Sequence, residues 1–327
     1  MRSRFPLLLL PLLASSCVHP AAARAPVAAA AVGVLPHRGG TLSYDATVAA
    51  PAGAKKIVLW IPVPRQEPVQ VVGKVTAPEH STRVSDRTHA NPAIRVELDP
   101  ANPTTHVEFE LLRAEEGPAA KLAAAQAEPA FDGKSFLSDE GFAIADDRIQ
   151  AIAAGIFKDV PQDADLRARK AFDYVLANMR YAKEGTGWGT GSTAWACDSK
   201  YGNCTDFHAL FLALIRTGGV PGRFRIGFSL PAQTGAVAGY HCWAEYFSAK
   251  NGWVPVDASE AWKHADRKDY LFGHLDPNRI GMSLGRDLVF EGQKGPALNY
   301  FVFPYAEADG QPIKVDTKVA WTDRAGT

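Results

Sequence analysis

The first part of the chain alternates apolar and polar residues with a period of two. Residues 42–48 and 107–111 place an apolar side chain at every second position, which is typical of strands with one buried face. Between them, residues 57–61 form a mostly apolar run that ends at Pro62, because proline cannot donate to a strand ladder. The pattern predicts a small β-sandwich domain over residues 41–113.

Helical periodicity follows an Ala-rich, turn-rich connecting segment at residues 114–144. Apolar residues recur every three or four positions over residues 149–156 and again over residues 168–179, which predicts two helices with one buried face each. An aspartate is placed to cap each first turn, namely Asp146 in the first helix and Asp163 or Asp165 in the second.

A third helix and three strands complete the predicted core of residues 145–265. The helix begins within residues 202–208, after a Gly-rich loop, and two glycines end it beyond Arg216. The last two strands flank a short turn and are predicted to form an antiparallel hairpin. The strands are expected at residues 223–230, 241–247 and 253–257.

The C-terminal part, residues 266–327, contains further apolar stretches at residues 300–305 and 315–321. We expect these stretches to be strands that complete the core or cover its edge. The order of the elements therefore predicts an α+β fold, in which a helix packs on an antiparallel sheet and a small β-sandwich precedes this core.

The N-terminus carries the pattern of an export signal. Arginines precede an apolar run at residues 5–13, which is too short to span a bilayer, and small residues lead from it to Cys17. Because this pattern resembles a lipobox, we expect residues 1–17 to be a signal peptide and Cys17 to carry a lipid anchor in the cell envelope, with residues 18–40 as a linker. The alternative is an ordinary secretory signal cleaved near residues 21–23, which would leave a soluble periplasmic or secreted protein.

Composition narrows the functional classes. The chain has 327 residues, with 35 Lys and Arg against 35 Asp and Glu. A protein without an excess of basic residues has no overall field to hold a polyanion. We therefore expect no nucleic-acid partner.

Cys204 is the candidate nucleophile. It lies in the first turn of the third predicted helix, where unpaired backbone amides and the positive end of the helix dipole favour the thiolate. The alternative is that Cys204 is a small buried residue that opens an apolar helix. Its spacing alone does not decide between the two.

His241 and Asp257 favour the catalytic interpretation. They lie on the two strands of the predicted hairpin and face the same side of the sheet when opposed residue numbers sum to an even value. The imidazole could then take the thiol proton while the carboxylate fixes its tautomer. His208 is the rival base, four residues after Cys204, although it is expected to face the packed side of the helix.

Three acidic residues near these positions are expected to have supporting roles. Asp206 lies in the first turn of the third helix and is expected to complement the helix dipole. Glu245 and Glu260 are expected to lie at the surface or behind the reacting groups.

The remaining cysteines leave two alternatives. If Cys17 carries a lipid, Cys197, Cys204 and Cys242 remain in an oxidising compartment, and a Cys197 to Cys242 bridge is one alternative. Three free thiols are the other, because the sequence does not give the distances between Cα atoms. The chain lacks Cys-x-x-Cys and His-Glu-x-x-His spacings, so we expect no metal and no cofactor.

Four linked motifs resemble the transglutaminase-like superfamily in their order and spacing. The resemblance covers about residues 145–265, and LWIPVP at residues 59–64 is similar to β domains that precede this core in bacterial members. The four motifs are GNCTDFH at residues 202–208, GVPGR at residues 219–223, HCWAE at residues 241–245 and GWVPVD at residues 252–257.

The resemblance implies a papain-like core and cysteine chemistry on a peptide or protein substrate. Cys204 would attack a carboxamide or peptide carbonyl, His241 would assist the loss of ammonia or amine, and water or a second amine would capture the thioester. The backbone N–H of Cys204 and a second donor would bind the oxyanion, with Trp188 and Trp195 as candidates for that donor. The calcium dependence of the mammalian enzymes is not expected here.

The resemblance does not select one product. The superfamily includes transglutaminases, deamidases, proteases and deglycosylating hydrolases, so the acceptor stays open. A binding or scaffolding module of the cell envelope with the same fold is the alternative of another class. An arylamine acetyltransferase-like enzyme is a distant one, because no phosphate-cradling loop is visible and export would separate it from acetyl-CoA.

Overall fold

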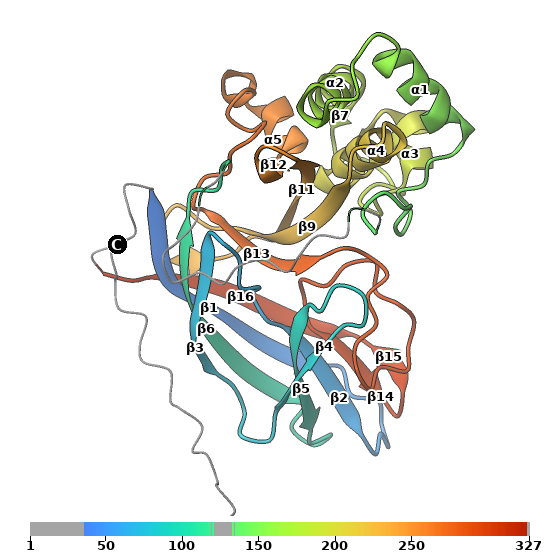
Figure 1. Ribbon diagram of the computed structural model, residues 1–327. Helices are drawn as coiled ribbons and strands as arrows, with labels where there is room; N and C mark the ends of the chain where they lie inside the picture. The colour runs from blue at the N-terminus through green and yellow to red at the C-terminus, as the bar shows by residue number, and fades with distance from the viewer. Residues whose placement is uncertain (1–35, 119, 121–132, 134, 326–327) are drawn as a thin grey trace, which may run out of the picture.

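Two five-stranded antiparallel sheets form a β-sandwich below a helical layer in the computed structural model, which describes residues 36–118, 120, 133 and 135–325 (Figure 1). One sheet has the order β10-β16-β1-β6-β3 and consists of β1 (His37–Val48), β3 (Gln70–Thr76), β6 (Thr104–Ala114), β10 (Gly235–Ala236) and β16 (Val315–Asp323). The other has the order β15-β14-β2-β5-β4 and consists of β2 (Ile57–Pro62), β4 (Thr82–Ser85), β5 (Pro92–Leu98), β14 (Tyr305–Ala308) and β15 (Gln311–Ile313).

The first strand confirms the alternating pattern and begins earlier than predicted. β1 buries the apolar positions of residues 42–48 and exposes or half-buries the positions between them. It starts at His37, inside the segment expected to be a linker. This start was not predicted, because Gly39 and Gly40 interrupt the alternation of apolar and polar residues. Gly40 is required by close packing, since a Cβ at this position would lie 2.4 Å from the ring of Trp321.

The C-terminal strands close the sandwich, contrary to the expectation that residues 266–327 complete the core. β16 pairs with β1 from Val48 opposite Val315 to Gly40 opposite Asp323, and β14 pairs with β2. β13 (Arg279–Leu284) does join the core sheet. An apolar strand fits any free sheet edge, and its sequence does not say which edge is free.

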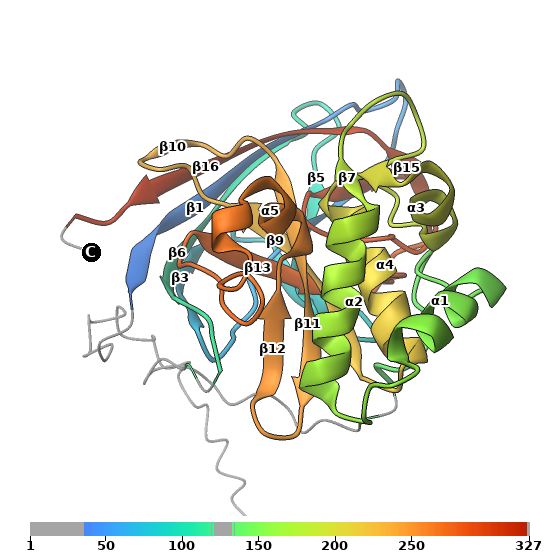
Figure 2. The ribbon, with the colours of Figure 1, turned by 90° about the horizontal axis from the view of Figure 1, so that it is seen from above.

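The core sheet has the order β12-β11-β9-β13 and carries the helices on one side (Figure 2). α4 (Cys204–Thr217) is buried from Cys204 to Arg216, as expected of a helix that other elements surround. The remaining core elements are β9 (Gly222–Ser229), β11 (Tyr240–Ser248), β12 (Gly252–Val256), α1 (Asp147–Phe157), α2 (Ala164–Asn178), α3 (Thr193–Ser199), α5 (Ala258–Lys263), β7 (Arg180–Tyr181), β8 (Tyr201–Gly202) and the 3-10 helix η1 (Ala265–Arg267).

The two predicted N-terminal caps are confirmed. The carboxylate of Asp146 accepts the amide of Ile149 at the start of α1, at 3.0 Å. Asp163, not Asp165, caps α2 by accepting the amide of Leu166 at 2.9 Å. Side-chain oxygens thus satisfy amides that a helix cannot pair internally.

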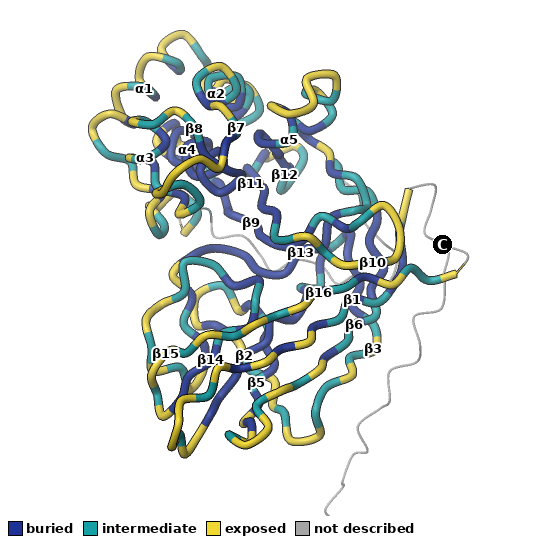
Figure 3. Tube along the Cα trace, turned by 180° about the vertical axis from the view of Figure 1, so that it is seen from behind, coloured by how far each residue is buried: buried dark blue, intermediate teal, exposed yellow. Residues whose placement is uncertain are grey.

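The sandwich and the core sheet share one hydrophobic cluster. On the core side this cluster includes residues of α4, β9 and β11, whose segments are coloured as buried in Figure 3. Tyr44 of β1 lies 6.1 Å from Phe228 of β9 between ring centroids. Its hydroxyl donates to the carbonyl of Val302 at 3.0 Å.

No helix among the described residues has the length and apolar character to span a bilayer.

Candidate active site

Cys204 is the first residue of α4, as predicted, and the helix start is capped from both sides. The side chain of Asn203 accepts the amide of Thr205 at 2.9 Å, and the carboxylate of Asp206 accepts the amide of Asn203 at 3.0 Å. Gly202 makes this packing possible, because a Cβ there would lie 2.3 Å from the Asp206 carboxylate. The arrangement is a capping box that fixes the backbone of Cys204.

Asp206 also holds the Gly-rich loop that precedes the helix. Its fully buried carboxylate accepts the amide of Gly189 at 2.7 Å and that of Gly191 at 3.0 Å. Asp206 lies in the first turn of α4, where we expected it to complement the dipole. The sequence did not reveal that the same carboxylate positions the loop.

His241 and Asp257 are brought together by the predicted hairpin. The register pairs Ala244 with Val256, so that opposed residue numbers sum to an even value. The Nε2 atom of His241 lies 2.6 Å from Oδ2 of Asp257. The other oxygen, Oδ1, accepts the Ser259 hydroxyl at 3.0 Å. The carboxylate is therefore fixed from two sides.

The charges of the three residues support a thiolate–imidazolium pair. Burial would raise the pKa of Asp257, but the charge of His241 outweighs it and holds that pKa well below its usual range. Burial would lower the pKa of His241, but the charge and hydrogen bond of Asp257 raise it to about 9. Hydrogen bonds from Cys242 and His241 lower the pKa of Cys204 well below that of a free thiol. Because Nε2 faces Asp257, Nδ1 of His241 is the nitrogen left for the thiolate.

His208 lies behind the nucleophile, on the packed side expected for it. It is fully buried, and its Nε2 accepts the amide of Ala258 at 3.1 Å. Burial lowers the pKa of His208, which favours its neutral ring. The raised pKa of His241 favours a charged ring instead. The structure therefore favours His241 over His208 as the base.

The two tryptophans do not supply the second oxyanion donor in this conformation. The indole N–H of Trp188 donates to the carbonyl of Gly185 at 3.1 Å. The indole N–H of Trp195 donates to the carbonyl of Tyr201 at 3.0 Å. The expectation that either indole is free to donate is wrong here, because the loop conformation sets the orientation of the ring.

Two polar residues beside the nucleophile were missed by sequence reasoning. The side-chain amide of Asn203 donates to the hydroxyl of Tyr240 at 2.9 Å. That hydroxyl lies 3.4 Å from Oγ1 of Thr205. Their positions directly before Cys204 and His241 in the sequence were the available signal.

Arg279 of β13 is a third residue that the sequence did not indicate. Its guanidinium lies 3.6 Å from Oδ2 of Asp257 and 3.6 Å from Oδ1 of Asp276. The side chain is buried. It adds a positive charge behind the carboxylate, which further favours the ionised form of Asp257.

Glu245 is fully buried, so the surface position, one of the two expected for it, is wrong and a position behind the reacting groups remains. Its carboxylate accepts Nη1 of Arg225 at 2.8 Å and also the Nε of Arg223. Burial raises its pKa, but these two arginines outweigh that effect and lower the pKa to about 2. Arg225 also bonds Glu67 of the sandwich domain. Glu260, by contrast, is half-buried.

The described cysteines Cys197, Cys204 and Cys242 are all free thiols, so the Cys197 to Cys242 bridge is wrong and the other alternative is observed. Cys17 lies outside the described residues. In the part of the chain that the structure describes, no three His, Cys, Asp or Glu side chains are grouped as a metal site needs.

Comparisons with known proteins agree with this architecture. Residues 150–258 match the model of the transglutaminase-like superfamily. An uncharacterized protein of Haemophilus influenzae is 34% identical over 145 residues, and the match covers 34% of this chain and 39% of that relative. The chain thus spans well under half the length of this relative.

One solved structure gives the same picture at the level of the fold. A candidate cysteine protease from Cytophaga hutchinsonii has a TM-score of 0.55 and 15% sequence identity, over 89% of this chain and 93% of that chain. The periplasmic domain of TgpA from Pseudomonas aeruginosa has a TM-score of 0.38 and 12% identity, over 73% and 98%. The likeness to the first structure extends over both the sandwich and the core.

Proposed function

Since this chain carries a transglutaminase-like domain at residues 150–258, we propose that it is an enzyme that transfers acyl groups from peptide or protein amides through a cysteine thioester. One observation carries the proposal. Cys204 begins α4 and has its pKa lowered by His241, whose Nε2 lies 2.6 Å from Oδ2 of Asp257. A nucleophile, a base and an orienting carboxylate are the parts that such a reaction needs.

In the first half of the reaction, the proton of Cys204 already resides on His241. The thiolate attacks the carbonyl carbon of the amide, and the carbonyl oxygen becomes an oxyanion. That oxygen is bound by the backbone N–H of Cys204 at the N-terminus of α4, because the side chain of Asn203 already accepts the next amide, that of Thr205. The imidazolium of His241 then gives its proton to the leaving nitrogen, the C–N bond breaks, and the thioester remains.

In the second half, water or a primary amine enters as the acceptor. His241, now neutral, takes a proton from the acceptor as it attacks the thioester carbonyl. The C–S bond breaks and Cys204 returns as the thiolate beside the imidazolium. Water gives hydrolysis or deamidation, and an amine gives a cross-link.

Asp257 acts on the imidazole throughout this cycle. Its negative charge stabilises the imidazolium, and its hydrogen bond keeps Nε2 away from the thiol. The Ser259 hydroxyl and the Glu260 amide hold the carboxylate at 3.0 Å each. The ring of His241 therefore keeps one orientation while its proton comes and goes.

The test uses a glutamine-containing protein and a fluorescent primary amine with the full chain. Ammonia release reports thioester formation, and fluorescence in the protein band separates the amine acceptor from water. We expect turnover with wild type and with Cys197→Ala, and none with Cys204→Ala. Turnover that persists in Cys204→Ala would contradict the proposal.

We further propose that the protein works in the cell envelope, attached through a lipid on Cys17. The apolar run and the small residues before this cysteine support the idea. Cells fed labelled palmitate should yield labelled wild type in the membrane fraction, whereas Cys17→Ala should be unlabelled. Unlabelled wild type outside the cytoplasm would favour the ordinary secretory signal instead.

A further inference from the structure

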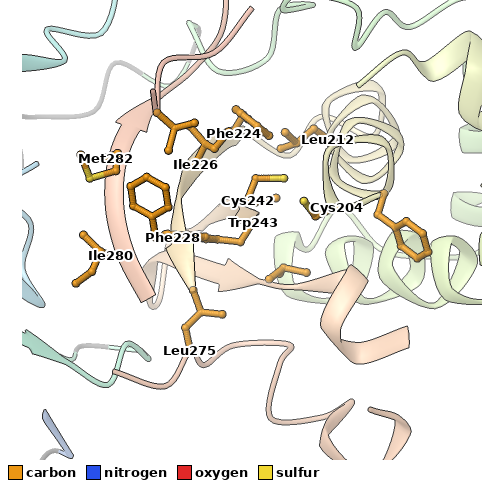
Figure 4. Close-up of a cluster of buried hydrophobic side chains, with 14 of the residues drawn as sticks. Cys204, Leu212, Phe224, Ile226, Phe228, Cys242, Trp243, Leu275, Ile280 and Met282 are labelled. Carbon is orange, nitrogen blue, oxygen red and sulfur yellow. The ribbon is translucent and has the colours of Figure 1, made fainter. Parts of the chain in front are cut away.

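A second thiol lies against the nucleophile. Cys242 of β11 is fully buried, and its Sγ lies 3.8 Å from Oγ1 of Thr205 and 3.6 Å from Nδ1 of His208. Both contacts are on the first turns of α4, the helix that Cys204 opens. Figure 4 shows the two cysteine side chains pointing toward each other from strand and helix, and each sulfur influences the pKa of the other.

The proposed acyl transfer leaves this second sulfur unexplained. Cys204, His241 and Asp257 supply the nucleophile, the base and the orienting carboxylate without Cys242. A small apolar residue would fill the same buried position without bringing a reactive group into the site. The feature that a thiol adds is the capacity to form a bond with another sulfur.

We propose that Cys242 is the resolving partner of Cys204 in a reversible disulfide, which makes the pair a site of oxidation by small hydroperoxides. Cys197 provides the contrast, because it lies on α3 and is half-buried. Two sulfurs whose side chains point toward each other from neighbouring elements need only a short approach to bond, whereas disulfides between distant positions require backbone movement.

The chemistry has two balanced steps. The Cys204 thiolate attacks the terminal oxygen of the hydroperoxide and the O–O bond breaks, which leaves Cys204 as a sulfenic acid. The departing oxygen takes the proton of the His241 imidazolium and leaves as an alcohol or water. The Cys242 sulfur then attacks the Cys204 sulfur. The S–O bond breaks, and the thiol proton leaves with the hydroxyl as water. The two cysteines have lost two electrons, which the hydroperoxide gained.

The surroundings of the two sulfurs favour Cys204 as the one that the peroxide oxidises and Cys242 as the one that then attacks it. The imidazolium of His241 favours the thiolate at Cys204, and thiolates are the form that peroxides oxidise. Burial and the neighbouring Cys204 sulfur raise the pKa of Cys242, which keeps it a thiol until Cys204 has reacted. The positive charge of Arg286 opposes this rise in the pKa of Cys242 only in part.

The regulatory meaning of this bond rests on the proposed function, although the bond itself does not. A disulfide would remove the nucleophile from acyl transfer, and a reductant would restore it. It would also protect Cys204 from irreversible oxidation to a sulfinic acid in an oxidising compartment. Cys242 would then be a cysteine that preserves the site.

The test follows the mass of the full-length protein, so it does not depend on turnover. Reduced wild type, Cys197→Ser and Cys242→Ser are treated with hydrogen peroxide, and cysteine-containing peptides are mapped. For wild type and Cys197→Ser we expect the loss of two hydrogen atoms, a peptide link between residues 204 and 242, and full reversal by dithiothreitol. For Cys242→Ser we expect two added oxygen atoms at Cys204 that dithiothreitol does not remove.

Three outcomes would overturn the inference: a sulfinic acid at Cys204 in wild type without the link, a link through Cys197, or unreacted thiols. If Cys242→Ser does not fold, the peptide map of wild type and Cys197→Ser still decides. A protein that forms the link yet has no activity on amides would retain the disulfide and lose the proposed function. Activity without the link would do the reverse.

Discussion

The carboxylate of Asp257 has polar neighbours on four elements, among them His208 of α4, whose Nε2 lies 3.7 Å from Oδ1. His241 lies 2.6 Å from Oδ2, and Arg279 lies 3.6 Å from the same oxygen. Ser259 and the amide of Glu260 donate to Oδ1 at 3.0 Å. Because its position and charge are both fixed, Asp257 can hold the imidazole of His241 without moving during the reaction.

Replacing Asp257 by Asn should remove the charge and leave the shape. The amide can donate to Nε2 of His241 and so favour the wrong tautomer. We expect the rate of acyl transfer in the amine-incorporation assay to fall by about 10³–10⁴-fold. Ser259→Ala is the matched control, since it loses one hydrogen bond to the carboxylate and should lose far less activity. A rate for Asp257→Asn close to wild type would contradict the assigned role.

Single residues were predictable where a motif fixed both backbone and neighbours. Cys204 lies at a helix start, and the hairpin register decided that His241 faces Asp257. The indole of Trp188 was not predictable, because its donor direction depends on the conformation of a glycine-rich loop. The sequence could not decide between a surface and a buried position for Glu245, because its arginine partner Arg225 lies on another strand.

At the scale of elements, the start of α4 and the Gly-rich loop before it form one hydrogen-bonded unit. Asp206 accepts three backbone amides, those of Gly189, Gly191 and Asn203. The loop borders the nucleophile, because a Cβ at Gly189 would lie 3.2 Å from the side-chain amide nitrogen of Asn203, the residue before Cys204. The loop and the reacting thiol are therefore positioned by the same carboxylate.

Asp206→Ala should leave these three amides without their acceptor. We expect a loss of about 1–3 kcal/mol in the free energy of unfolding, measured in urea, and faster hydrogen exchange over residues 185–191. Asp163→Ala is the control, because it removes one capping bond from α2 and should cost about 1 kcal/mol without changing the loop. Unchanged exchange in the loop of Asp206→Ala would show that other contacts hold it.

Elements were predictable in proportion to their length. α1, α2 and α4 are long enough to show a helical period, and their start signals were visible in the sequence. α3 and α5 are too short to show a period, and both lie in segments that look like loops. Asp257 caps α5, a role that cannot be read from a residue already assigned to the end of a strand.

At the scale of the whole molecule, buried charges join the sandwich to the core. Arg225 of β9 bonds both Glu245 of β11 and Glu67, which precedes β3. Arg113 of β6 lies 3.4 Å from Glu67. Each charge has an opposite partner, which offsets the cost of its burial. The relative position of the two units is thus held by ion pairs as well as by the shared hydrophobic cluster.

Glu245→Gln should remove the carboxylate that Arg223 and Arg225 share in a buried site, while Arg225 keeps Glu67 as an acidic partner. We expect a loss of about 3–5 kcal/mol in the free energy of unfolding at neutral pH. The matched control is Glu97→Gln, which breaks an exposed pair with Lys56 at 2.7 Å and should cost about 0–1 kcal/mol. Similar costs for the two variants would mean that the buried network does not stabilise the fold.

The difference in stability between wild type and Glu245→Gln should depend on pH in a definite direction. The pKa of Glu245 is lowered from 4.5 to about 2 in the folded protein. The ionised carboxylate therefore stabilises the fold at pH values above the pKa that Glu245 has in the unfolded chain. This contribution to the free energy of unfolding is lost as the pH falls through about 2. Wild type should approach Glu245→Gln in stability at low pH. A stability difference that stays constant down to the acid limit would contradict the ionised state of Glu245.

The overall arrangement was only partly predictable. The order of elements gave an α+β fold with a sandwich before the core, because those units follow one another in the chain. The return of β16 to β1 was not predictable, since their pairing joins segments from opposite ends of the sequence. Local patterns describe which face of a strand is buried, and distant pairing decides which sheet it joins.

The pH dependence of alkylation by iodoacetamide shows whether Cys204 is a thiolate activated by His241. His241 faces the charges of Asp257 and Arg279 and has a pKa raised to about 9, so it stays positive across the neutral range. In wild type, we expect alkylation to be already at its plateau at neutral pH, with its rise well below the range of a free thiol. In His241→Ala the rise should move up to that range or above it. A wild-type rise at the position of a free thiol, unchanged in His241→Ala, would mean that His241 does not activate Cys204.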